Sequence, residues 1–204
     1  MRICGQFNKL YLLISGWWRE LKTLIVYGTR YGATASTSEE IAKVLREEGF
    51  NVRVVNVKEE KIRDINEYEL IIVGSGMQMG KWTGEAEDFL KKFQKEFADK
   101  KIALFVSSMK TVSEREGKTE DLEKSRKIDL DDKVAKYGLN PIALGFFGGV
   151  LDFNKMNIIT RKTFGFIKPQ LEKDGFKQIQ PDVYELRDWD EIRNWARELA
   201  QKAK

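Results

Sequence analysis

The chain of 204 residues contains no histidine and only one cysteine, Cys4. These two shortages exclude Ser-His-Asp and Cys-His catalysis, cysteine-held iron–sulfur clusters and the usual zinc sites. Redox chemistry in this protein must therefore come from a bound organic cofactor. A single cysteine also provides no disulfide framework, which favours a reducing compartment. We accordingly predict a cytoplasmic protein without a metal site.

Long hydrophobic runs are missing as well. Residues 10–18 are apolar, but they fall far short of the roughly 20 residues that a spanning helix needs. A signal peptide is disfavoured, because residues 17–20 (Trp-Trp-Arg-Glu) make a poor cleavage site. We interpret residues 1–20 as an extension that either packs on the domain or places its tryptophans at a membrane interface. Residues 21–204 are predicted to form a single domain.

The segment from Tyr27 to Ser36 carries the most specific motif in the chain. An apolar strand at residues 24–28 breaks into Thr29-x-x-Gly32-x-Thr34 and then enters a helical pattern. Hydroxyls, a glycine and unpaired N–H groups at a helix N-terminus favour a phosphate through hydrogen bonds and the helix dipole. An ordinary strand-to-helix turn rich in small residues is the alternative interpretation.

Two other nucleotide-binding motifs are absent from this segment. A P-loop requires Gly-Lys-Ser/Thr at the helix start, but no lysine occurs between Lys22 and Lys43. A dinucleotide site requires G-x-G-x-x-G and an acid at the end of the second strand, and neither is present. What remains is a phosphate loop of the flavodoxin type, which holds the single-phosphate cofactor FMN.

Strand and helix patterns alternate along the rest of the chain. Asp188 begins the last helix, whose apolar face has helical spacing, and Glu191 completes a capping box. We predict an α/β fold: a flavodoxin-like, doubly wound five-stranded parallel sheet of strand order 2-1-3-4-5 in three α/β/α layers. The five strands are expected at residues 24–28, 52–57, 70–73, 102–106 and 140–145.

The ligand of such a sheet lies outside the carboxyl ends of the strands, at the switch point between the first and third strands. The loops that follow the first, third and fourth strands meet at this place. We therefore predict that the cofactor is bound by Thr29, Arg30, Tyr31, Gly32, Ala33, Thr34, Ser75, Gly76, Met77, Gln78, Met79, Gly80, Trp82, Ser107, Ser108 and Met109. No catalytic side chain is predicted, because the flavin carries the chemistry.

Individual roles within this set follow from side-chain chemistry. Thr29 and Thr34 are expected to hold the phosphate, while Arg30 either adds charge or faces solvent. The glycines of the loop at residues 74–84 let the backbone approach the flavin ring. Trp82 is a candidate for stacking on that ring, and the alternative is that it covers the next helix. Met77 and Met79 are adaptable fillers around a flat ligand or residues folded onto the core.

The chain resembles flavodoxin-domain proteins and, more closely, the menaquinone-dependent protoporphyrinogen oxidase family. The resemblance covers residues 23–200 and rests on the phosphate loop, the Gly74-Ser-Gly-Met-Gln-Met-Gly-Lys loop and the aromatic last helix. It implies an FMN-dependent dehydrogenase that passes electrons from a flat hydrophobic substrate to a quinone. A soluble flavodoxin-type electron carrier and a structural or regulatory flavin protein are the alternatives. Carriers of that type are acidic, by resemblance, whereas this chain has a net charge of +4.

A further part of the resemblance is an aromatic and basic insert near the last strand, at about residues 145–168. We expect the insert to contact a quinone or an anionic membrane surface, or to form a homodimer interface or cover the sheet edge. The apolar residues of this prediction are Phe146, Phe147, Phe153, Ile158, Ile159, Phe164, Phe166 and Ile167. Its basic residues are Lys155, Arg161, Lys162 and Lys168. No nucleic-acid partner is predicted.

The segment at residues 111–132 is strongly charged and departs from the family pattern, so it leaves the substrate unassigned. We expect residues 111–136 to be partly exposed. Leu130, Val134 and Tyr137 predict an amphipathic helix only in the later part of this region.

Overall fold

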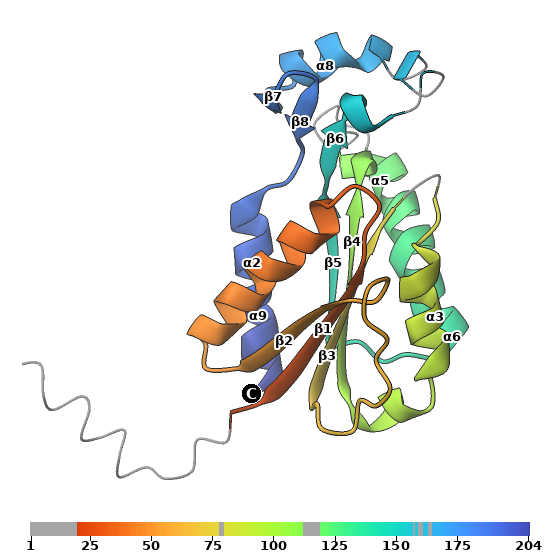
Figure 1. Cartoon of the computed structure of the whole chain (residues 1–204), viewed down its shortest axis with the longest axis vertical. Coiled ribbons are helices and arrows are strands. Elements are labelled where there is room, and N and C mark those ends of the chain that lie inside the picture. The colour runs from red at the N-terminus through yellow and green to blue at the C-terminus, as the bar shows by residue number, and fades with distance from the viewer. Residues whose placement is uncertain (1–19, 78–79, 112–118, 157, 159–160, 163–164) are drawn as a thin grey trace, which may run out of the picture.

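The computed structural model describes residues 20–77, 80–111, 119–156, 158, 161–162 and 165–204. Five parallel strands form the central sheet in the order β2-β1-β3-β4-β5, which confirms the predicted strand order and fold class (Figure 1). The strands are β1 (Lys22–Gly28), β2 (Asn51–Asn56), β3 (Leu70–Gly76), β4 (Lys101–Ser108) and β5 (Ala143–Gly148).

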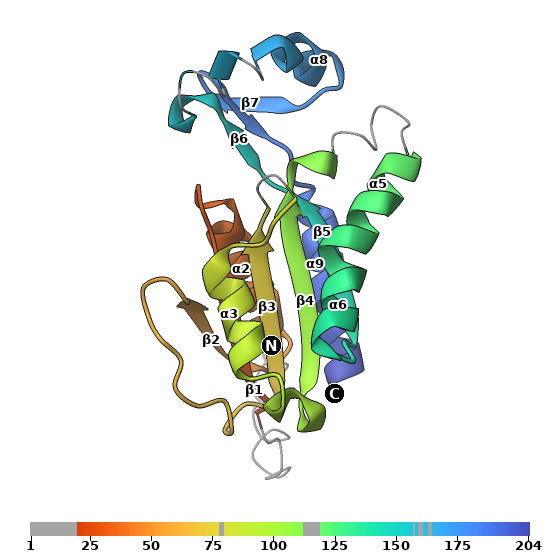
Figure 2. The ribbon, with the colours of Figure 1, turned by 90° about the vertical axis from the view of Figure 1, so that its right-hand side faces the viewer.

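Helices cover both faces of this sheet, as the nearly continuous burial of β3 and β4 requires. α2 and α9 lie on one face, and α3, α5 and α6 lie on the other (Figures 1 and 2). Their bounds are α2 (Ala33–Glu47), α3 (Gly84–Lys92), α5 (Thr119–Arg126), α6 (Asp132–Tyr137) and α9 (Trp189–Ala203). Among the described residues, the central sheet therefore has an apolar core on each of its two sides.

The last strand of the sheet lies further along the chain than residues 140–145, where it was predicted. β5 runs to Gly148, so it includes Phe146 and Phe147, which we had assigned to the insert. Successive side chains of a strand point to opposite faces. Phe146 accordingly joins the core under α3 and α6, and Phe147 joins the core under α2 and α9. Both rings are buried, so the expectation that they contact a membrane is wrong.

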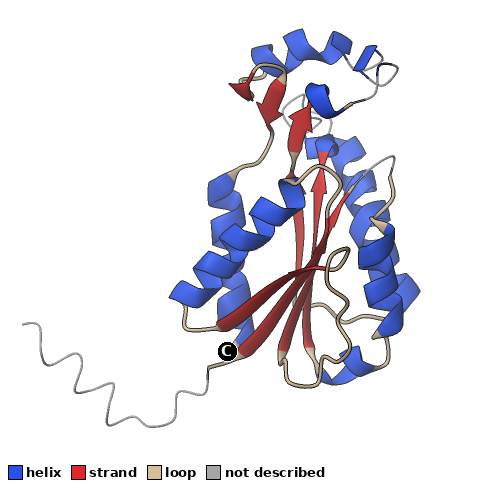
Figure 3. Ribbon diagram, viewed as in Figure 1, coloured by secondary structure: helices blue, strands red, loops and turns tan. Residues whose placement is uncertain are grey.

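A second, antiparallel sheet of order β6-β8-β7 lies beyond the carboxyl ends of the main strands (Figure 3). It consists of β6 (Val150–Asp152), β7 (Lys177–Gln180) and β8 (Val183–Glu185), and α8 (Lys168–Lys173) packs on it. Short 3₁₀ turns, η4 (Phe153–Lys155) and η5 (Gly165–Ile167), lie between β6 and α8. Phe153, another ring expected at a membrane, is fully buried in this sheet's own core.

Arg187 joins the small sheet to the main domain. Its guanidinium binds both carboxylate oxygens of Glu185 at 2.7 and 2.6 Å and stacks 4.2 Å over the Trp189 ring. The same side chain donates to the Ala33 carbonyl at 3.3 Å and to Ser36 Oγ at 2.5 Å, both in the first turn of α2. The small sheet is therefore tied to the helix that follows the predicted phosphate loop.

The charged region becomes helical earlier than its sequence pattern predicts. α5 begins at Thr119, and a π-helical segment, η3 (Lys127–Asp131), connects it to α6. The apolar Leu122 packs on the core beneath α3, which explains why a strongly charged helix forms here. Residues 112–118 lie outside the described part of the chain.

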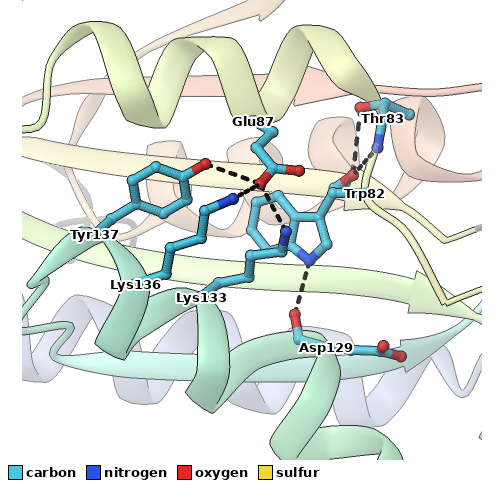
Figure 4. A network of polar contacts seen from close by, with 8 residues as sticks. Trp82, Thr83, Glu87, Asp129, Lys133, Lys136 and Tyr137 are labelled. Carbon is cyan, nitrogen blue, oxygen red and sulfur yellow. Dashed lines mark hydrogen bonds and ion pairs between the residues drawn. The ribbon is translucent and has the colours of Figure 1, made fainter.

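A polar cluster fixes α6 against α3 (Figure 4). Glu87 Oε1 accepts hydrogen bonds from Lys133 Nζ at 2.8 Å, Lys136 Nζ at 2.5 Å and the Tyr137 hydroxyl at 2.8 Å. Burial raises the pKa of Glu87, but these three donors outweigh it and lower the pKa to about 2. The cluster therefore carries a carboxylate that stays ionised over the whole physiological pH range.

Within the described residues, none of the helices combines the length and the apolar character needed to cross a bilayer.

Candidate cofactor site

The loop after β1 has the geometry of an anion-binding turn. Gly32 adopts a left-handed conformation with φ 96°, and its N–H donates to Thr29 Oγ1 at 3.0 Å. α2 begins directly afterwards, without a side-chain cap and without an acidic residue in its first turn. Its first N–H groups and the positive end of its dipole therefore remain available for a phosphate.

Thr34 lies beneath this loop, with an exposed fraction of only 1%. Gly76, the last residue of β3, approaches so closely that a Cβ atom there would lie 3.1 Å from Thr34 Oγ1. Glycine at position 76 therefore lets the loop after β3 reach the loop after β1. Arg30 and Tyr31 are exposed, as expected if Arg30 faces solvent, and Ala33 is half-buried.

A cavity of about 250 Å³ opens beside the loop after β1. It is lined by Thr29, Arg30, Tyr31, Lys58, Thr83 and Glu85. Lys58, Thr83 and Glu85 were not among the predicted site residues. Lys58 follows β2, whose carboxyl end lies beside that of β1, so the strand order alone could have indicated it. The cavity combines hydroxyls with two basic side chains and one carboxylate, so the basic side chains outnumber the acidic one, as an anionic ligand requires.

Ser75 supports the loop rather than facing the cavity. Its side chain is fully buried, and its Oγ accepts the N–H of Thr83 at 2.9 Å and lies 3.3 Å from Thr83 Oγ1. These contacts fold the segment after β3 back onto the start of α3. Met77 is half-buried against the core, Gly80 is exposed with φ 71°, and Gln78 and Met79 lie outside the described residues.

Trp82 is a core residue in this structure. It is 3% exposed, and its indole N–H donates to the Asp129 carbonyl at 2.7 Å (Figure 4). A ring that stacks on a cofactor needs an open face, and this one has none. The geometry therefore matches the alternative interpretation, in which Trp82 covers the neighbouring helix, and it speaks against ring stacking.

The segment after β4 forms the third part of the edge. The carbonyl of Ser107 accepts the N–H of Met77 at 2.9 Å, which joins the loops after β3 and β4. Ser107 Oγ is buried without a hydrogen-bond partner among the described residues, so it has an unused capacity for a ligand. Ser108 Oγ accepts the N–H of Lys110 at 3.2 Å, and Met109 is half-buried.

These loops meet at one edge of a 2-1-3-4-5 sheet and define an α/β protein of the flavodoxin class. The family described as "Flavodoxin domain" matches residues 24–178, and the chain belongs to this family. The membership agrees with FMN as the predicted cofactor.

Among individual proteins, the chain is similar to protoporphyrinogen IX dehydrogenase [quinone] of Escherichia coli. The identity is 24% over 186 residues, covering 88% of this chain and 95% of the relative. The protein of the same name from Leishmania major is 25% identical over 183 residues, covering 88% of this chain and 74% of that protein. The resemblance to protoporphyrinogen oxidases predicted from the sequence is thereby confirmed.

Solved structures of flavodoxins share the fold. A short-chain flavodoxin associated with a bacterial microcompartment superposes with a TM-score of 0.55 at 15% identity, covering 90% of this chain and 99% of that chain. A Fusobacterium nucleatum flavodoxin mutant bound to flavin mononucleotide gives a TM-score of 0.50 at 18% identity, covering 90% of this chain and 97% of that chain.

Proposed function

We propose that the protein is an FMN-dependent oxidoreductase that transfers electrons from protoporphyrinogen IX, or a similarly flat hydrophobic substrate, to a quinone. The observation that carries the proposal is the similarity to quinone-linked dehydrogenases over 88% of this chain and 95% of the Escherichia coli protein. That length extends past the parallel sheet into the small sheet. The small sheet lies beyond the carboxyl ends of the parallel strands, and this position near the predicted cofactor loops favours an enzyme that binds a substrate there.

The residues present fit FMN. The N–H groups at the start of α2, together with the hydroxyls of Thr29 and Thr34, would hold the phosphate. The loop after β3 and residues 107–109 would line the ring, where Ser107 Oγ has no partner among the described residues. Bound FMN supplies the acceptor for a hydride, so the protein's part is to bind, orient and shield.

The small sheet is placed to take part in substrate binding. Lys155 Nζ donates to the Tyr31 carbonyl at 3.2 Å, and Arg187 reaches the first turn of α2. Both contacts bring the small sheet to the edge of the phosphate loop. A substrate lying over the ring would therefore meet the small sheet on its outer side.

We propose that a smaller part of the insert than the sequence predicted contacts the membrane. Ile158 and Phe166 are 75% and 76% exposed, and the basic Lys162 is exposed near them in sequence. Arg161 and Lys168 contribute less positive charge, because both form ion pairs with Asp182, at 2.8 and 2.5 Å. Ile159 and Phe164 lie outside the described residues. The contact with a quinone-containing membrane would then depend mainly on Ile158 and Phe166.

Anaerobic reduction of the purified protein tests the enzymatic proposal. We expect released FMN by mass spectrometry, bleaching of the flavin by protoporphyrinogen IX, and reoxidation by menadione. A protein that binds FMN and is reduced by dithionite, but not by protoporphyrinogen, would instead be an electron carrier. A protein that does not bind FMN even when FMN is added at saturating concentration would overturn the proposal, because every later step requires the bound cofactor.

Thr34→Ala tests the phosphate site separately. Removing a charge-assisted hydrogen bond should weaken FMN binding by about 1–3 kcal/mol in a fluorescence titration. Thr23→Ala is the matched control, because Thr23 is an equally buried threonine but lies near the start of β1, at the end remote from the phosphate loop. Equal affinity of the two variants would remove Thr34 from the site.

Membrane contact is tested by sedimentation with anionic liposomes at low salt. The double variant Ile158→Ser and Phe166→Ser should lose binding, whereas Ile128→Ser should keep it. Ile128 is 52% exposed but lies in η3, outside the small sheet. Absence of wild-type binding would reject the membrane contact and favour a soluble protein.

A further inference from the structure

The carboxyl group of Asp129 is buried without a hydrogen bond. The residue is 1% exposed, and neither Oδ1 nor Oδ2 has a hydrogen-bond partner among the described residues. Within the described part of the chain, its ion-pair partner is Lys110, whose Nζ lies 3.9 Å from Oδ2. A buried polar group without partners is costly, so a carboxyl in this state calls for a functional explanation.

The backbone around Asp129 holds this carboxyl in place. The residue belongs to the π-helical segment η3, a type of turn that occurs frequently at functional sites. Its carbonyl accepts the Trp82 indole N–H at 2.7 Å, which anchors η3 to the loop at residues 74–84. In Figure 4 the carboxyl group extends away from the Glu87 cluster, in the direction in which the strand arrows point.

Asp129 lies close to the predicted ring-binding loops. Lys110 belongs to η2 (Met109–Thr111), which follows β4 without a break and contains Met109 of the predicted ring wall. The Asp129–Lys110 pair therefore lies at the same carboxyl edge of the sheet as the candidate cofactor site. Lys110 is 42% exposed, so protons from solvent can reach the pair from that side.

The charges around Asp129 allow it to change its protonation state. Burial raises the pKa of Asp129, while the positive charges of Lys110 and Lys133 lower it, and the net shift is upward. Lys133 also binds Glu87 of α3, at 2.8 Å, whereas Lys110 forms an ion pair with Asp129 itself. The chain has no histidine, so a buried carboxyl whose pKa is raised is a group suited to accept and release a proton.

We propose that Asp129, with Lys110 beside it, stores the proton that accompanies hydride transfer at this edge. The proposal rests on the proposed function. Dehydrogenation removes a hydride and a proton from the substrate; the hydride goes to the bound flavin, and the proton goes to the Asp129 carboxylate. When a quinone is reduced to the quinol, it takes up that hydride and that proton, and Asp129 returns to the carboxylate. Protonation also neutralises the buried Asp129 carboxylate while the neighbouring reduced flavin would carry a negative charge, so the two negative charges do not repel each other.

The pH dependence of the two-electron midpoint potential of bound FMN tests this proposal without turnover, using dithionite as reductant. One additional proton per two electrons makes the potential fall more steeply, by about 30 mV per pH unit. We expect this steeper region in the wild type and its loss in Asp129→Asn. The asparagine keeps the backbone carbonyl that Trp82 binds. Asp131→Asn, an exposed carboxyl of the same segment, is the control and should behave as the wild type.

Lys110→Met provides a second variant that leaves Asp129 in place. Loss of the nearby cation should raise the pKa of the carboxyl and move the steeper region to higher pH. In infrared difference spectra, reduction should produce a protonated-carboxyl band that Asp129→Asn lacks. A wild type without the steeper region, or an Asp129→Asn protein that retains it, overturns the proposal. If FMN binds but protoporphyrinogen does not reduce it, the proposed substrate is rejected. The pH dependence of the FMN midpoint potential still tests the role of Asp129, because dithionite is the reductant in that experiment.

Discussion

The parallel sheet and the small antiparallel sheet are stabilised in different ways. Residues of β3 and β4 are buried along nearly their whole length between two layers of helices, whereas all four residues of β7 are exposed. The small sheet has one compact apolar core: Leu151, Phe153, Leu171, Phe176, Tyr184 and Leu186. Ion pairs of Asp182 with Lys168 and Arg161 supplement it at the surface, where such pairs contribute little.

The comparison indicates a rigid base that carries the cofactor loops and a less stable cover above them. Local opening is expected where few apolar contacts are buried. The two regions meet at Gly148, where a Cβ atom would lie 2.0 Å from the Leu186 carbonyl, and at the Arg187 contacts with α2. Three variants test this difference.

The largest effect is expected for Phe153→Ala. Phe153 is fully buried and packs edge-on against Tyr184 at 6.0 Å, so its removal should cost about 3–5 kcal/mol of small-sheet stability. Hydrogen exchange should accelerate in β6, β7 and β8 but not in β3 and β4. Phe166→Ala, at a 76% exposed position, is the control and should change neither. Equal acceleration in both sheets would show that they unfold together.

A smaller effect is expected for Glu87→Gln in the main domain. Loss of hydrogen bonds from two lysines and a tyrosine should reduce the free energy of unfolding by about 1–3 kcal/mol at pH 7, measured in urea. The folded-state pKa of about 2 lies below the ordinary 4.5. The stabilisation is therefore complete above about pH 4.5 and disappears as the pH falls toward 2, so the variant should lose less stability over this interval.

Asp88→Asn, an exposed acid on the same helix, is the control for this variant. Small-sheet exchange rates should stay unchanged in Glu87→Gln. Faster exchange there would contradict the independence of the two regions.

The smallest effect is expected for Asp188→Ala, at the junction of the two regions. Asp188 Oδ1 accepts the N–H groups of Asp190 and Glu191 at 2.9 and 3.1 Å and caps α9. Loss of this cap should cost about 1 kcal/mol in the urea unfolding of the main domain. Glu198→Ala on the exposed side of α9 should cost less. If Asp188→Ala destabilises the small sheet more than it destabilises α9, the side chain of Asp188 mainly stabilises the junction between the two regions.

Much of the main domain could be predicted because its signals are local. Continuous apolar runs mark β1, β3 and β4, and the turn at Thr29–Thr34 combines a glycine and hydroxyls at a helix start. The Asp188 cap was also visible in the sequence. Each of these features depends on residues within one turn or one strand.

The remaining features depend on contacts between distant segments. β6 and β8 have three residues each, too few to show a period, and the turn before β8 uses Asp182 at φ 62°. Whether Trp82 stacks or packs depends on a carbonyl 47 residues away. The burial of Phe146 and Phe147 follows from the end of β5, which propensity alone placed too early. Similarly, the burial of the Asp129 carboxyl beside Lys110 arises only when α3, η2 and η3 come together.

The open edge at β7 has a consequence for solubility. An exposed edge strand offers unpaired backbone groups to a second copy of the chain, which is a route to aggregation. β7 is only four residues long, carries Lys177, and shows a shift in register between Gln178 and Gln180. Ile179, 51% exposed, is its one large apolar side chain. The protein can therefore carry an uncovered strand in its small sheet without a regular template along which fibres could grow.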